Sequence, residues 1–205
     1  MSFFKETRTA GIALIILGVI NLIGALAALV GVVSAKDGIV ASAVVACIGP
    51  IIMAVLYFRF GVSVKNGGIP EKIDILAYFV RLAGLSQIII AVFNLWNAWE
   101  TSGAAAALGG LVISIIIGLI ILFVAGRIND RKQDTGDKII WVILVVLFAL
   151  SALANIFAVI GVLVSGVSFD LSILDNLVLP IVSFIINVFM LLLLFDSDVK
   201  REMNM

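Results

Sequence analysis

The chain alternates between six long apolar runs and short polar links. The runs cover roughly residues 9–33, 39–59, 75–99, 104–126, 139–165 and 173–195. Each run is long enough for a helix that crosses a bilayer, which needs about 20 predominantly apolar residues. Backbone N–H and C=O groups find no partners in lipid, so such runs form helices. The pattern predicts an all-α polytopic membrane protein whose six transmembrane helices form one domain, residues 1–205.

The links between the runs differ in charge, and this difference predicts the orientation of the helices. The amino end, the second and fourth links, the carboxyl end and the run ends beside them hold every Lys and Arg except Lys36. Positive charge collects on the cytoplasmic side of a membrane. We therefore expect both termini to be cytoplasmic. Arg8 and Arg81 should anchor the first and third helices at that interface, because long basic side chains reach toward it.

An internal repeat sets the plan of the chain. The segment Arg8–Leu22 is matched without gaps by Arg81–Leu95, and the identical positions include an arginine, a glycine and an asparagine. A fainter third copy covers Val142–Ile156 and keeps mainly Asn155. Self-similarity at a fixed spacing is the sequence signature of a repeated structural unit.

The repeat coincides with three helical hairpins, predicted as residues 1–66, 67–134 and 135–205. The second and fourth runs end in the related segments Phe58–Gly61 and Phe123–Gly126. All three hairpins start from the same side of the membrane, so the repeats are parallel, unlike the inverted repeats of many secondary transporters. We expect a pseudo-threefold axis along the membrane normal to relate them.

Asn21, Asn94 and Asn155 occupy the same position in the three copies. Small residues such as Gly18 and Ala25 share a helix face with Asn21. Small residues let membrane helices approach closely, and an amide among them can form a hydrogen bond to a neighbouring helix. Two interpretations stay open: the three amides tie helices together, or they line a polar ring around the pseudo-threefold axis that contacts an ion, a lipid headgroup or water.

Other positions mark interfaces and packing surfaces. Trp96 and Trp99 lie where the third helix leaves the outer leaflet, and Trp141 lies where the fifth enters the inner one. Tryptophan is enriched at membrane–water interfaces, so we interpret all three as interface anchors. In the fourth run, small residues recur at every fourth position, which favours close helix packing: Ala106, Gly110, Ser114 and Gly118.

The composition leaves little chemistry for catalysis. The chain has no histidine, one cysteine and as many acidic as basic residues, so we predict no catalytic residues, no metal, no cofactor and no nucleic-acid partner. No Asp, Glu, Lys or Arg lies near the centre of a run, which argues against proton-coupled transport. Two carboxylate pairs could bind a divalent cation, although solvated helix ends explain them as well: Asp196 with Asp198, and Asp170 with Asp175.

Three hairpins with glycine-rich motifs such as Gly11–Gly18 resemble the HdeD-like short-repeat membrane proteins, which act in acid resistance. The resemblance is architectural and covers most of the chain, but the third repeat departs from it, with Val145 where Gly11 and Gly84 stand. It implies a multi-pass protein of the plasma (inner) membrane of a prokaryote with a stress-related role. No functional residue is carried over.

Two functions follow as expectations. The first is a non-enzymatic structural or accessory membrane protein, surrounded by lipids and assembled as a homo-oligomer or with other membrane subunits. The second is a passive channel or carrier for a small neutral solute or lipid, lined by Asn21, Asn94 and Asn155. A membrane enzyme would depend on Asp196 and Asp198 alone.

Overall fold

The computed structural model describes residues 7–34, 40–130, 135–165 and 177–205, and their regular structure is helical throughout. The all-α prediction is therefore confirmed. The first five helices are long and apolar enough to cross a membrane, and the sixth is apolar but shorter. The first residues of the predicted sixth span lie outside the described residues. The helices are α1 (Thr7–Val33), α2 (Ala41–Lys65), α3 (Lys72–Ser102), α4 (Ala104–Asp130), α5 (Thr135–Ser165), α6 (Leu179–Leu194) and α7 (Ser197–Glu202).

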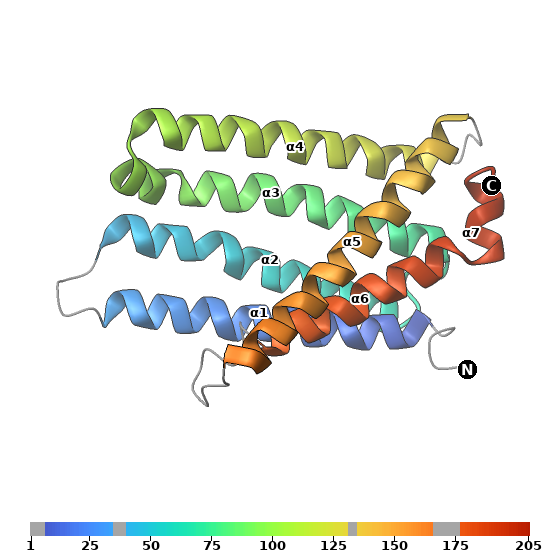
Figure 1. Cartoon of the computed structure of the whole chain (residues 1–205), viewed down its shortest axis with the longest axis horizontal. Helices are drawn as coiled ribbons and strands as arrows, with labels where there is room; N and C mark the ends of the chain where they lie inside the picture. The colour runs from blue at the N-terminus through green and yellow to red at the C-terminus, as the bar shows by residue number, and fades with distance from the viewer. Residues whose placement is uncertain (1–6, 35–39, 131–134, 166–176) are drawn as a thin grey trace.

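Helices α1 to α4 lie side by side in one layer, and α5 and α6 cross that layer obliquely (Figure 1). Each helix of the layer packs along the next one in the chain, and α6 packs on α1 and α3. The start of α1, the turn between α2 and α3, the end of α4 and α7 all lie at one end of the bundle. Equivalent hairpins around a threefold axis would have equivalent neighbours, and this layered packing of the described helices does not give them.

Two glycine contacts hold the first two hairpins together. A Cβ atom added to Gly11 would lie 2.8 Å from the carbonyl oxygen of Gly61, and one added to Gly84 would lie 2.9 Å from that of Gly118. Backbones that approach this closely leave no room for a side chain. The repeated glycines at positions 11 and 84 therefore do the same work in α1 and α3.

This packing changes the alignment of the even-numbered helices. The sequence pairs Gly61 with Gly126, but a Cβ atom on Gly126 would meet nothing within 4 Å. Gly118, eight positions earlier, contacts α3 instead. The third hairpin has no equivalent contact, because Val145 replaces the glycine and packs against the core as a partly buried apolar residue.

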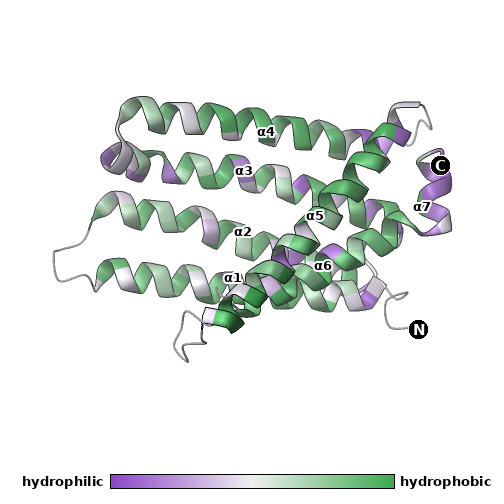
Figure 2. Ribbon diagram, viewed as in Figure 1, coloured by the Kyte–Doolittle hydropathy of each residue, from purple (hydrophilic) through white to green (hydrophobic). Residues whose placement is uncertain are grey.

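Apolar side chains cover most of the outer surface, and hydrophilic residues gather at the two ends of the helices (Figure 2). Helix α4 buries only Ala107, Gly118, Ala125 and Ile128. Its remaining large apolar residues are exposed, as are most of those on α5. Such a surface suits a bilayer, which solvates apolar side chains. The five long apolar helices indicate a membrane-embedded protein.

Candidate functional site

The three repeated asparagines form hydrogen bonds within their own helices. Asn21 and Asn155 each donate from Nδ2 to the carbonyl oxygen four residues earlier, at 2.9 and 2.8 Å. Asn94 accepts a weak bond of 3.4 Å from Asn97. Their amides thus bridge successive turns of one helix, a local alternative open to any polar side chain in a helix.

A polar cavity of about 280 Å³ lies between α1, α2, α3 and α6. Asn21 lines it, whereas Asn94 and Asn155 do not, so the structure does not bring the three asparagines together around one cavity. Asn187 of α6 is the second amide at this cavity, and sequence analysis did not single it out. Its only signal was a polar residue within a strongly apolar run. The lining is Leu17, Asn21, Tyr57, Phe79, Ser86, Leu179, Ser183, Ile186 and Asn187.

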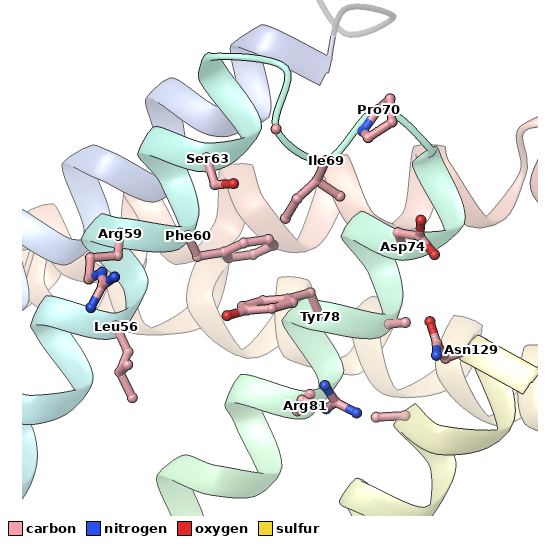
Figure 3. A pocket seen from close by; sticks show the side chains of 13 residues that line it. Leu56, Arg59, Phe60, Ser63, Ile69, Pro70, Asp74, Tyr78, Arg81 and Asn129 are labelled. Carbon is pink, nitrogen blue, oxygen red and sulfur yellow. The ribbon is translucent and has the colours of Figure 1, made fainter.

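The largest cavity lies at the end of the bundle where α2 turns into α3, and we call it the arginine pocket. Its volume is about 880 Å³. The end of α2, the following turn, the start of α3 and the end of α4 form its walls (Figure 3). The lining is Leu56, Arg59, Phe60, Ser63, Gly68, Ile69, Pro70, Asp74, Ala77, Tyr78, Arg81, Ala125 and Asn129.

A tight turn brings the two arginine-bearing helices together. Gly67 has a φ of 76°, a left-handed conformation that favours glycine. The next glycine, Gly68, donates its N–H to the carbonyl oxygen of Ser63 at 2.9 Å. The rings of Phe60 and Tyr78 then stack across α2 and α3, with centroids 4.7 Å apart. The stack forms an apolar wall of the pocket.

Arg59 and Arg81 are the two cationic groups of this pocket. Both side chains are exposed, and within the described part of the chain neither forms an ion pair or a hydrogen bond. Asp74 is the one acidic residue of the lining, and it has an interaction of its own. Arg8, the repeat equivalent of Arg81, is exposed at the start of α1 and does not line the pocket.

The tryptophans predicted as interface anchors lie at opposite ends of the bundle. Trp96 and Trp99 are 49% and 50% exposed at the far end of α3. Trp96 donates from Nε1 to Glu100 at 2.7 Å, and Glu100 also accepts a short hydrogen bond from the buried Ser42 of α2. These two bonds fasten α2 to α3 at the end farthest from the arginine pocket.

Trp141 has a structural partner that the sequence did not reveal. Its Nε1 donates to the carbonyl oxygen of Leu194 at 2.8 Å and so satisfies one free acceptor at the end of α6. The ring of Phe195 meets it edge-on at 5.3 Å. The ammonium of Lys200 lies 5.0 Å from the Phe195 ring centre and 5.8 Å from that of Trp141, within the range of a cation–π interaction.

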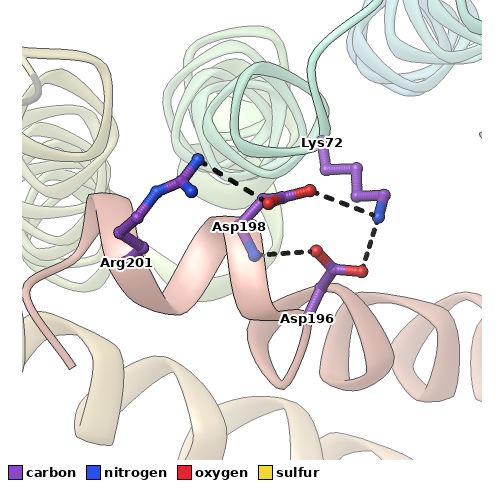
Figure 4. Close-up of polar contacts among 4 residues, drawn as sticks. All are labelled: Lys72, Asp196, Asp198 and Arg201. Carbon is purple, nitrogen blue, oxygen red and sulfur yellow. Dashed lines mark hydrogen bonds and ion pairs between the residues drawn. The ribbon is translucent and has the colours of Figure 1, made fainter.

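The carboxylate pair Asp196 and Asp198 is occupied by basic side chains (Figure 4). Lys72 lies 2.5 Å from Asp196 and 4.0 Å from Asp198, and Arg201 lies 3.7 Å from Asp198. Asp196 also caps α7 by accepting the N–H of Asp198 at 3.1 Å. The pair therefore clamps α7 to the start of α3. The other pair, Asp170 and Asp175, lies outside the described residues.

Comparisons with family models, with characterised proteins and with solved structures found no match.

Proposed function

We propose that this protein is a non-enzymatic membrane protein with a structural or accessory role, working in contact with further copies of itself or with other membrane subunits. The observation that carries the proposal is the outer face of α4. On this face, Gly109 has no atom within 4 Å of an added Cβ. Ile113, Ile116 and Ile120 follow it on the same side of the helix, each at least 52% exposed.

Glycine in this position favours an interface. An exposed glycine in a helix costs roughly 1 kcal/mol relative to alanine, and within this chain nothing uses the space at Gly109. A neighbouring membrane helix would use it, because small residues allow close approach. Lipid chains would fill the same space without needing a glycine.

Disulfide crosslinking in native membranes tests the proposal. The single native cysteine is first removed as Cys47→Ala, and then either Ile113→Cys on the α4 face or Phe157→Cys on α5 is introduced. Phe157 is 69% exposed and serves as the matched control. We expect a crosslinked product for position 113 and little for position 157. A doubled mass identifies a second copy, and another mass identifies a different subunit. Equal crosslinking at both positions, or none, would contradict the interface.

A second function is favoured by the cavity that Asn21 and Asn187 line. A passive channel or carrier for a small neutral solute or lipid needs polar groups at membrane depth, and this cavity supplies two amides and two serine hydroxyls. Sequence reasoning placed the lining at Asn21, Asn94 and Asn155 instead. Glycerol flux into liposomes separates the two sets. For a carrier, Asn21→Leu with Asn187→Leu abolishes flux and Asn94→Leu with Asn155→Leu preserves it; a scaffold shows no flux in any form.

The membrane and the orientation are part of the same proposal. Together with the resemblance to HdeD-like proteins, the charge pattern supports the inner membrane of a prokaryote, cytoplasmic termini and a stress-related role. Fusions of the carboxyl end, after Met205, to a fluorescent protein or to alkaline phosphatase test the orientation. Fluorescence without phosphatase activity is expected, and the reverse result would invert the topology.

A further inference from the structure

We propose that the arginine pocket binds the phosphate group of an anionic phospholipid headgroup, held by Arg59 and Arg81. The two guanidinium groups come from different helices and line the same cavity, with the ring of Tyr78 beside them (Figure 3). Guanidinium groups bind phosphate through paired N–H donors. The site does not depend on the proposed interface of α4, because its residues face the interior of the α2–α3–α4 corner.

The charge of the pocket favours an anion. The charged groups of its lining are Arg59, Arg81 and Asp74, which leaves one net positive charge. Neither arginine is neutralised by a carboxylate within the described residues. Ser63 and Asn129 add a hydroxyl and an amide from α2 and α4, and neither has a hydrogen-bond partner through its side chain in the same part of the chain.

The depth of the pocket fits the headgroup region. Arg81 precedes Trp96 on α3 by fifteen residues, which correspond to about 22 Å of helix. The hydrocarbon core is about 30 Å thick, so tryptophans at one interface place the Arg81 backbone a few ångströms inside the other. Its long side chain then reaches the level of the phosphates. Basic pockets between transmembrane helices at this level bind anionic headgroups.

The size and the walls of the pocket fit a lipid better than a bare ion. A cavity of about 880 Å³ lies in the range of small-molecule sites, roughly 300–1,000 Å³, and is far larger than one phosphate needs. The stacked rings of Phe60 and Tyr78 supply an apolar wall. Leu56 and Ile69 extend it. These side chains suit the glycerol and the first methylene groups below a headgroup.

Native mass spectrometry of the full chain tests this proposal. The protein is released from nanodiscs that contain equal amounts of phosphatidylglycerol and phosphatidylcholine, so that both lipids offer a phosphate but only one has a net charge. We expect retained phosphatidylglycerol to exceed retained phosphatidylcholine roughly thirtyfold, as two arginines near a membrane surface would give. Arg59→Gln with Arg81→Gln should remove this preference, whereas Arg8→Gln, the matched control, should leave it unchanged.

Two further arms keep the outcome decisive. In Arg59→Lys with Arg81→Lys the charge is kept and the paired donors are lost, so retention should fall only in part if guanidinium geometry matters. Unchanged melting temperatures exclude misfolding as the cause. Inorganic phosphate is added alone to detergent-solubilised protein: binding of phosphate without any lipid preference would assign the pocket to a soluble anion. That result, or an equal preference in Arg8→Gln and the double variant, would overturn the lipid site.

Discussion

The contact between Gly11 and Gly61 makes a sharp prediction for stability. In Gly11→Ala the new methyl group would lie 2.8 Å from the carbonyl oxygen of Gly61, whereas ordinary contacts begin at 3.4 Å. The obstructing atoms belong to the backbone of α2, so no side chain can rotate away and the two helices must separate. Overpacking of this kind costs about 1–3 kcal/mol. Better helix propensity returns up to about 1 kcal/mol, which leaves Gly11→Ala destabilised.

Gly126→Ala is the matched control for this change. It brings the same gain in helix propensity, but the added methyl group meets nothing within 4 Å. We therefore expect Gly126→Ala to be unchanged or slightly stabilised, and the difference between the two variants to equal the packing cost of about 1–3 kcal/mol. Gly84→Ala should fall between them, because the side chain of Leu122 forms part of its obstruction and can move.

Unfolding in mixed micelles with increasing dodecyl sulfate, followed by circular dichroism, measures these differences. Each variant is compared with the wild type at the same detergent ratio, because membrane-protein stability depends on it. The expected order of stability is Gly126→Ala, Gly84→Ala, Gly11→Ala. If Gly11→Ala were as stable as Gly126→Ala, the close approach of α1 and α2 would not contribute to the fold.

Three further changes test polar contacts between helices. Lys72→Met should release α7 by removing the ion pair to Asp196, at a cost of about 0.2–1 kcal/mol and with faster proteolysis after residue 196; unchanged cleavage would contradict the clamp. Trp141→Phe keeps the ring and loses one hydrogen bond to α6, so unfolding should cost about 0.5–1.5 kcal/mol less, as chemical denaturation would show. Arg127→Met removes a partner 3.4 Å from Asp137, which is only 4% exposed; we expect a loss of about 1–3 kcal/mol, and a smaller loss in Arg127→Lys.

The sequence was sufficient for the helices because lipid leaves an apolar run no other regular structure. Its repeat also located Gly11 and Gly84, which pack in the same way in two hairpins. It misaligned the partner helix, since an exposed glycine such as Gly126 looks the same in sequence as a packed one such as Gly118. Only the geometry of the second hairpin distinguishes them.

The candidate sites were harder to predict for a related reason. Asn21, Asn94 and Asn155 share a repeat position, but which neighbour each amide meets depends on how the hairpins pack, and the third hairpin crosses the others. The arginine pocket depends on the turn at Gly67, which brings Arg59 and Arg81 to the same cavity although the repeat pairs Arg81 with Arg8. Sequence analysis treated these arginines only as interface residues.

Polar contacts between helices gather at the end of the bundle that holds the arginine pocket. There Lys72 joins α3 to α7, Arg127 joins α4 to α5, and Trp141 joins α5 to the end of α6. At the opposite end, the printed bonds between different helices reduce, in the described residues, to that between Ser42 and Glu100. Contacts that cross between helices resist local opening, while helix ends without them fray.

This asymmetry predicts how the bundle moves. Amide hydrogen exchange in nanodiscs should be slower in residues 72–78, beside the arginine pocket, than in residues 96–102 at the other end of the same helix. Both segments are helix ends, so their helical hydrogen bonds alone do not separate them. A pocket built into the firmer end keeps its two guanidinium groups positioned before a ligand arrives, which lowers the ordering cost of binding. Faster exchange in residues 72–78 would mean that the pocket has to be organised by its ligand.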